Sequence, residues 1–224
     1  EMPATLTALQ TLASDLKDNS RSNFVMSGFA DAVASANPEP VSLKLQRVCA
    51  KFLVDGVIRT EWDGDAPLSF DITDIYLANA ATASTFTYNG TAGPSINLRT
   101  SVELTDDTVY RDLTVAPKMS WTPGSQYNNG LSFYAYPNSC PHSVSSSFTP
   151  RATLLVVEAR LDGGKYYYPF QFDSLRSNSR YIITNLTVHR PGSSSPYEPV
   201  LFSAASANVT VAGWEDGASR NVEI

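Results

Sequence analysis

The sequence is poor in the residues that most often carry catalysis, metal binding and nucleic-acid binding. It contains 2 cysteines, 2 histidines, 16 Lys and Arg residues and 22 Asp and Glu residues, for a formal net charge of −6 over 224 residues. Two cysteines are too few for a disulfide-rich scaffold or a four-cysteine zinc site. The cationic residues form no sequence cluster of the kind that binds nucleic-acid phosphates, so nucleic acid is not an expected partner.

Long apolar runs are also missing, as are the usual targeting segments. No stretch approaches the roughly 20 apolar residues that a membrane-spanning helix needs. The sequence shows neither a signal peptide nor an N-terminal cysteine for lipid attachment, and it begins at Glu1 without an initiator methionine. We expect this start to reflect processing or trimming of a longer precursor.

The residues that are plentiful favour β-structure. Ser, Thr, Asn, Tyr and Pro are frequent, whereas Lys and Glu, which usually cover exposed helix faces, are scarce. A length of 224 residues accommodates one large β domain or two small sandwiches. The start of the chain is the exception. There the leucines from Leu6 to Leu16 are spaced by three and four residues, which predicts a short amphipathic helix over residues 4–17.

Alternating apolar residues predict β-strands along the rest of the chain. These stretches are residues 41–54, 70–77, 131–136, 166–172, 180–189 and 208–214. Residues 24–28 are predicted as a short apolar strand, and residues 153–161 are nearly continuously apolar, as expected for a central sandwich strand. The alternation changes parity near Gln46–Arg47, which indicates either a β-bulge or a strand buried on both faces. The turn-rich stretch 79–93 leads to Gly93–Pro94, where we place a domain boundary.

The best-defined local motif is a β-hairpin in the second half. Asp162–Lys165 contains two adjacent glycines, which suit a tight turn with positive φ between two strands. Pro169 lacks the N–H group that a sheet ladder needs, so the second strand is expected at an edge or a bulge. Tyr166 and Tyr168 of that strand share a face, which is either a half-buried hairpin surface or an aromatic platform for sugars.

Candidates for catalysis are few. A Ser-His-Asp hydrolase would need His142 or His189 as its base, and His189 is expected at the exposed end of a strand. Cys140 lies two residues before His142, but no basic cluster or helix N-terminus is visible to activate its thiol. Phosphate-binding, dinucleotide-binding and nucleophile-elbow motifs are missing. We therefore expect a protein that is not an enzyme.

Metal binding and disulfide bonding have equally weak signals. The aspartates from Asp63 to Asp74 could gather around calcium, but their spacing differs from an EF-hand loop, and Asp is also an ordinary turn residue. No metal or other cofactor is therefore expected.

Cys49 and Cys140 can form a disulfide only if the fold brings them together. Otherwise one is a small core residue and the other lies in a loop.

Several short segments share their order and spacing with a known protein family. They are Phe24–Gly28, Leu43–Phe52, Ser132–Asn138, Thr153–Val157, Tyr167–Pro169, Arg180–Val188, Pro191–Gly192 and Val209–Trp214. Each is a weak motif by itself, but together they extend over nearly the whole chain and resemble the fimbrillin family, the subunits of type V pili. They occupy core-strand and turn positions, so the resemblance concerns fold and assembly.

The resemblance implies an all-β protein of two transthyretin-like β-sandwich domains in tandem, with a short N-terminal helix. Residues 1–94 would form the N-terminal sandwich and residues 95–224 the C-terminal one. Family members carry further strands ahead of the stretch that matches residues 4–17, so the N-terminal sandwich is expected to be incomplete. Fimbrillins are exported as lipoproteins, trimmed by a trypsin-like protease after Arg or Lys, and polymerised into a cell-surface fimbria anchored at the outer membrane.

Trimming in this family opens a groove that a strand from the C-terminal region of a neighbouring subunit fills. An unfinished sandwich exposes unpaired backbone groups, and the added strand supplies both hydrogen bonds and alternating side chains. Residues 206–224 suit the role of donor because they contain two alternating apolar runs. The candidate assembly residues are Val209, Val211, Trp214, Val222 and Ile224.

The expected function is that of a structural or adhesive fimbrial subunit. Its expected partners are other fimbrial subunits, together with host surface ligands or glycans. The alternative is a carbohydrate-binding surface lipoprotein with Tyr166 and Tyr168 as its platform, and a small hydrolase comes third. Stalk, tip and anchor subunits are not separable on this sequence.

Overall fold

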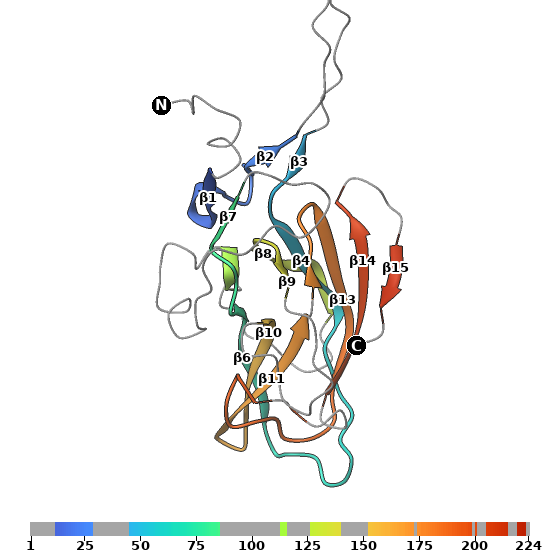
Figure 1. The fold of residues 1–224 in the computed structure, drawn as a ribbon. Coiled ribbons are helices and arrows are strands. Elements are labelled where there is room, and N and C mark those ends of the chain that lie inside the picture. Colours follow the sequence, from blue (N-terminus) through green and yellow to red (C-terminus); the bar gives the residue numbers. More distant parts are fainter. Residues whose placement is uncertain are drawn as a thin grey trace, which may run out of the picture.

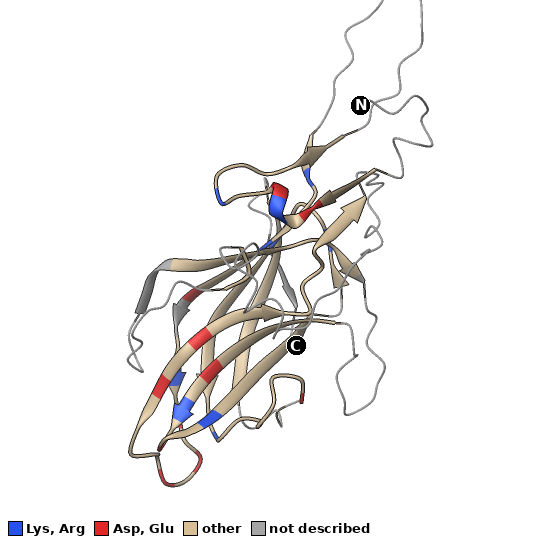
Figure 2. Cartoon of the chain, turned by 90° about the vertical axis from the view of Figure 1, so that its left-hand side faces the viewer, with Lys and Arg blue, Asp and Glu red and all other residues tan. Residues whose placement is uncertain are grey.

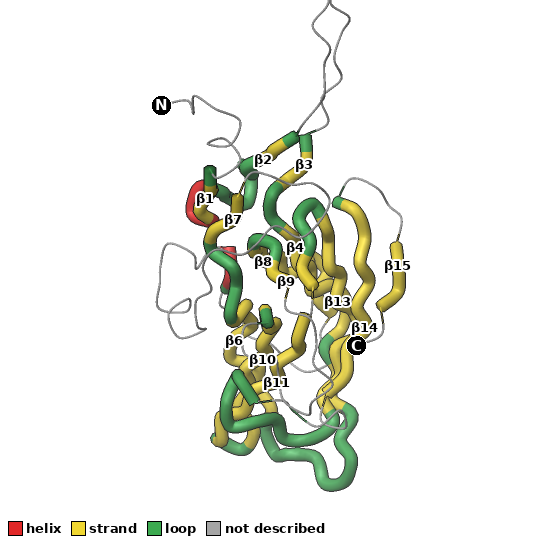
Figure 3. Tube along the Cα trace, in the orientation of Figure 1, coloured by secondary structure: helices red, strands yellow, loops and turns green. Residues whose placement is uncertain are grey.

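The computed structural model of the chain describes residues 12–28, 45–85, 113–115, 126–139, 152–172, 174–198, 200, 205–214 and 219–222. Regular structure in them is almost entirely β-strand (Figures 1 and 3). The earlier elements are β1 Ala13–Asp15, the 3₁₀ turn η1 Leu16–Asp18, β2 Met26–Ser27, β3 Gln46–Arg47, β4 Ala50–Val57, β5 Arg59–Thr60, β6 Phe70–Ala78 and β7 Ala83–Thr85. The later strands are β8 Gln126–Ala135, β9 Asn138–Ser139, β10 Thr153–Leu161, β11 Gly164–Phe172, β12 Ser174–Leu175, β13 Ser179–Val188, β14 Ala205–Gly213 and β15 Ser219–Val222.

Two sheets form the body of the molecule. The larger is six-stranded, in the order β15-β14-β13-β4-β8 with β5 also paired to β13, and the smaller is three-stranded, in the order β11-β10-β6. Strand β13 runs parallel to β4 and β5, whereas β14 and β8 pair antiparallel with their neighbours. The short pairs β1–β7 and β2–β3 lie at the end of the sandwich where β4 and β13 begin (Figure 1).

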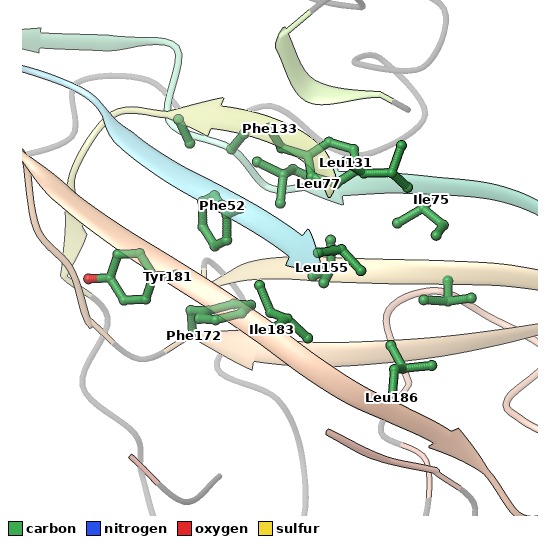
Figure 4. Packing of buried hydrophobic residues seen from close by; sticks show 14 of the residues in the cluster. Phe52, Ile75, Leu77, Leu131, Phe133, Leu155, Phe172, Tyr181, Ile183 and Leu186 are labelled. Atoms are coloured by element: carbon green, nitrogen blue, oxygen red, sulfur yellow. The ribbon is translucent and has the colours of Figure 1, made fainter. Parts of the chain in front are cut away.

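The core lies between the two sheets. Phe52 of β4 meets Phe172 of β11 edge-to-face, with ring centroids 5.0 Å apart, and stacks on Tyr181 of β13 at 5.4 Å. Leu155 of β10 and Ile183 of β13 point into the same layer (Figure 4). Inward residues alternate with outward ones along these strands, because successive side chains of a strand point to opposite faces.

Most of the predicted strands are confirmed. Strand β6 covers the stretch predicted over 70–77, and β10 has the predicted bounds. Strands β13 and β14 cover all but the last residue of the stretches predicted over 180–189 and 208–214. The hairpin turn between β10 and β11 has φ values of 46° at Asp162 and 83° at Gly163, as a tight turn of this kind requires. Strand β11, which carries Pro169, lies at the edge of its sheet as expected.

The amphipathic helix predicted over residues 4–17 is wrong where the structure describes that stretch. Ala13–Asp15 form β1, paired with β7, and Leu16–Asp18 form the single 3₁₀ turn η1. Both the side chain of Asp15 and that of Asp18 cap this turn. Tertiary contacts override the leucine spacing, because a short helix has little stability of its own. Residues 4–11 lie outside the described part.

The parity change predicted near Gln46–Arg47 corresponds to an interruption between two strands. Strand β3 ends at Arg47, the chain bends at Val48 and Cys49, and β4 begins at Ala50. Val48, Cys49 and Ala50 are all buried in succession, so the alternation restarts with the opposite phase. The backbone groups freed by the bend bond elsewhere, the amide of Val48 to the carbonyl of Val25 and the carbonyl of Cys49 to the amide of Asn178.

The tandem division into residues 1–94 and 95–224 is not confirmed. Gly93–Pro94 lies outside the described residues. Strands that precede it in the sequence nevertheless pair with strands that follow it, in the six-stranded sheet and in the three-stranded sheet. Strand β6 pairs with β10, and β4 lies between β13 and β8. The described parts before and after this point therefore contribute to one hydrophobic core. No helix in the described part is long and apolar enough to cross a membrane.

Candidate assembly strands

Strands β14 and β15 contain the candidate donor residues that the structure describes. Strand β14 pairs on one side with β13 and on the other with β15, with Val209 opposite both Ile183 and Val222. Strand β15 is the terminal strand of this sheet and is paired to β14 alone among the described strands. A terminal strand retains unpaired N–H and C=O groups on its outer side, which makes it a template for another strand.

The structure assigns the candidate residues two different environments. Val209 is 6% exposed and belongs to the core, while Val211 and Trp214 are half-buried and pack against that core. These three residues hold the sandwich of their own chain together. Val222 lies in the outer strand β15, and Ile224 lies outside the described residues.

Trp214 is held by aromatic and cationic neighbours that the sequence analysis missed. Its ring lies 5.2 Å from Phe24 and 6.0 Å from Tyr134, measured between centroids, and the guanidinium of Arg47 lies 4.7 Å from its centroid. The backbone N–H of Trp214 donates to the carbonyl of Asn178. Trp214 and these four partners come from five separate parts of the chain, so no sequence spacing signals the cluster.

Both outer edges of the three-stranded sheet are covered locally in the described part. The outer edge of β11 exchanges two backbone hydrogen bonds of 2.9 Å with Ser193, through Tyr167. Val115 forms a bridge with Tyr76 at the outer edge of β6. Tyr76 and Val115 belong to a second apolar cluster, with Ala78, Leu154 and Val156. Covered edges do not readily pair with other chains.

The prediction that Tyr166 and Tyr168 form an exposed aromatic platform for sugars is wrong. Tyr168 is fully buried, and Tyr166 is half-buried against the main core cluster. The hydroxyl of Tyr168 donates to the carbonyl of Arg190, and burial raises its pKa well above the ordinary value. The shared face of these residues therefore points to the core, since β11 closes the three-stranded sheet over it.

The residues considered for catalysis do not meet in the described part of the chain. His189 lies with Nδ1 2.9 Å from the carbonyl oxygen of Glu61 and Nε2 3.3 Å from the hydroxyl of Ser206. Cys49 is a free, fully buried thiol, and burial raises its pKa to about 12. A thiol of this kind is inert as a nucleophile. His142 and Cys140 lie outside the described residues.

The aspartates considered for calcium have separate partners. Asp63 forms an ion pair with Arg190 at 3.2 Å, Asp74 accepts from the backbone amide of Ile75, and Asp71 lies opposite Arg160 in the sheet. Where the chain is described, no three His, Cys, Asp or Glu side chains are grouped as metal ligands.

Comparisons with known proteins find a likeness in fold to several solved structures. No protein-family model matches the chain, and no curated protein matches it. A candidate cell adhesion protein from Bacteroides eggerthii is 19% identical with a TM-score of 0.69, over 94% of this chain and 71% of that one. Another, from Parabacteroides distasonis, is 17% identical with a TM-score of 0.62, over 97% of this chain and 72% of that one.

A protein with a known place in a fimbria also matches. The tip fimbrial protein Mfa3 from Porphyromonas gingivalis, solved with a C-terminal truncation, is 12% identical with a TM-score of 0.50, over 93% of this chain and 72% of that one. At these identities the comparisons establish a shared fold. The chain has the fold of these fimbrial and candidate cell adhesion proteins, in agreement with its resemblance to the fimbrillin family.

Proposed function

We propose that the chain is a non-catalytic subunit of a bacterial cell-surface fimbria that polymerises by strand donation. The fold shared with a tip fimbrial protein and with candidate cell adhesion proteins supports the fimbrial part of this proposal. The observation that carries the assembly part is the position of β15 at the edge of the six-stranded sheet. Export as a lipoprotein and anchoring at the outer membrane belong to the same proposal and follow from the fimbrillin resemblance.

The donor segment is the part of the chain after β14. Val209 and Val211 lie in a strand that is paired on both sides, so removing them would open the core. Strand β15 is joined to the sheet through four residue pairs, from Ala212–Ser219 to Val209–Val222. Exchanging these for equivalent pairs in a neighbouring chain conserves the backbone hydrogen bonds, which is the basis of β-strand addition.

Removing Ser219–Ile224 tests this proposal. We expect the shortened chain to fold, because the core between the sheets is retained, and to form no fibres. Electron microscopy with antibody against the chain measures fibres, and circular dichroism measures folding. The matched control replaces the same six residues with Gly and Ser, which keeps the length and removes the alternating apolar side chains. Normal fibres from the deleted chain would exclude this segment as the donor.

The alternative of a sugar-binding lipoprotein has less support. Its platform was expected on Tyr166 and Tyr168, and these side chains face the core. Burying an aromatic ring between two sheets leaves no free face for a sugar ring to stack on.

A further inference from the structure

Charges in the described residues are segregated along the sandwich. The basic end is the end where β4 and β13 begin, and the acidic end is the one where they finish, since Arg180 lies opposite Lys51 and Val188 opposite Thr60. The described cations at the basic end are Lys17, Arg21, Arg47, Lys51, Arg176 and Arg180, against the carboxylates of Asp15 and Asp18. The carboxylates in the half of the sandwich toward the acidic end are Asp55, Glu61, Asp63, Asp65, Asp71, Asp74, Glu158, Asp162 and Glu198, against the cations Arg59, Arg160, Lys165 and Arg190. Figure 2 shows most red positions in the lower half of the molecule, far from the β2–β3 pair.

The basic end carries like charges side by side on the outer sheet face. Lys51 of β4 and Arg180 of β13 are direct neighbours in the parallel register, and both point outward because Phe52 and Tyr181 point into the core. Arg21 reaches the same region, where its Nη1 donates to the carbonyl of Ser132 at 2.8 Å. Like charges on adjacent strands destabilise a sheet, so this arrangement costs stability unless an anion lies over it.

Within the described part, no carboxylate neutralises this pair. The ion pairs there join Lys17 to Asp15, Lys165 to Glu158 and Arg190 to Asp63, so none involves Lys51 or Arg180. The Nε atom of Arg180 is buried without a hydrogen-bond partner. Burial lowers the pKa of Lys51, and Arg180, Arg21 and Arg47 lower it further.

We propose that Lys51 and Arg180, with Arg21 and Arg47 beside them, receive the acidic end of a second copy of this chain. The inference rests on the proposed function, since it describes how fimbrial subunits find one another. The described residues of the two ends are complementary in charge, and a contact between unlike ends leads to an open filament when its rotation does not close a ring. The acidic end presents the loop between β5 and β6, where Glu61 and Asp65 are exposed and Leu68 is 99% exposed.

Complementary charges on two surfaces contribute more to the rate and orientation of association than to its final strength. Reversing charges at one end is therefore expected to slow association by about tenfold at low salt. The difference should disappear at about 1 M salt, where the Debye length falls to about 3 Å.

The experiment compares full chains carrying opposite charge reversals. The variant K51E/R180E alters the basic end, and E61K/D65K alters the acidic end. Light scattering measures the rate of association, and each variant alone should associate about tenfold more slowly than the wild type at low salt. An equal mixture should recover part of the rate, because the altered basic end of one copy fits the altered acidic end of the other. The matched control R59E/R160E makes the same change in net charge at the acidic end and should not slow association.

The outcomes separate this inference from the proposed function. Fibres that grow at the wild-type rate in K51E/R180E would overturn the inference and leave strand donation intact. Wild-type chains that form neither fibres nor smaller assemblies at low salt would overturn both. Dextran sulfate is added as a competing anion in a separate arm. If it binds through Lys51 and Arg180 while the chains do not associate, the basic end is a site for acidic polysaccharide and the inference is wrong.

Discussion

Tyr136 shows how single side chains attach the N-terminal segment to the sandwich. Its hydroxyl lies 2.7 Å from the hydroxyl of Ser14, accepts from the amide of Asn19 at 2.9 Å and donates to the carbonyl of Asp15 at 3.1 Å. Ser14 and Asp15 belong to β1, and Asn19 directly follows η1. The side chains of Ser14 and Asn19 are buried. Burial raises the pKa of Tyr136 to about 12, so it remains a neutral donor at physiological pH. This residue therefore helps to decide that Ala13–Asp15 form a strand instead of a helix.

Replacing Tyr136 with Phe should lower the free energy of unfolding by about 1–3 kcal/mol, because Ser14 and Asn19 lose a buried partner. Urea denaturation measures the change. The control is Tyr166→Phe, since the Tyr166 hydroxyl makes no hydrogen bond to another described residue. Equal stability of Tyr136→Phe and the wild type would contradict a structural role for this network.

At the scale of elements, the loop after β13 protects the outer edge of β11. Gly192 approaches the backbone so closely that a Cβ atom would lie 2.4 Å from the carbonyl oxygen of Tyr167. The next residue, Ser193, exchanges two hydrogen bonds with Tyr167. The Pro191–Gly192 segment, which is part of the family resemblance, thus helps to cover the outer edge of β11. Glycine is required at position 192 because a side chain there would not fit against the backbone of Tyr167.

Gly192→Ala should push this loop away from β11 and destabilise the chain by about 1–3 kcal/mol through overpacking. Hydrogen exchange should become faster at the amides of Tyr167 and Ser193. Ser194→Ala, which alters an exposed side chain of the same loop, is the control and should leave exchange unchanged. Unaltered protection of Tyr167 in Gly192→Ala would mean that the loop accommodates the methyl group without leaving the edge.

At the scale of the whole molecule, the two large sheets share one core. Leu155 is fully buried in the central strand β10, where it lies opposite Phe170 on one side and Leu77 on the other. Its contacts therefore join a strand from the first part of the chain to a hairpin from the second. Because both parts contribute to the same layer, we expect them to unfold together.

Leu155→Ala should reduce the free energy of unfolding by about 2–5 kcal/mol, since it opens a cavity in this layer. Calorimetry should still show one transition, and hydrogen exchange should speed up in β4 and β13 alike. Leu68→Ala, at a position 99% exposed, is the matched control and should change stability by no more than about 0.5 kcal/mol. Two separate transitions, with β4 and β13 in different ones, would indicate independent units and support the two-domain division.

The sequence by itself determined the individual strands of the second half, because their signals are local. A nearly continuous apolar run placed β10, and alternating apolar residues placed β13. Adjacent glycines placed the turn at Asp162–Gly163, and the missing N–H of Pro169 placed β11 at an edge. The same local reasoning failed at Leu12–Leu16, where helix spacing competed with long-range pairing to β7.

Only the tertiary structure decided which strands became neighbours. The pairing of β4 with β13 and of β6 with β10 joins residues more than 70 positions apart, and such pairings leave no spacing pattern in the sequence. For the same reason Lys51 and Arg180 appear isolated along the chain and are adjacent in the sheet. Charge complementarity and shared cores arise from residues that meet in space, so they could be recognised only once the sheet register was known.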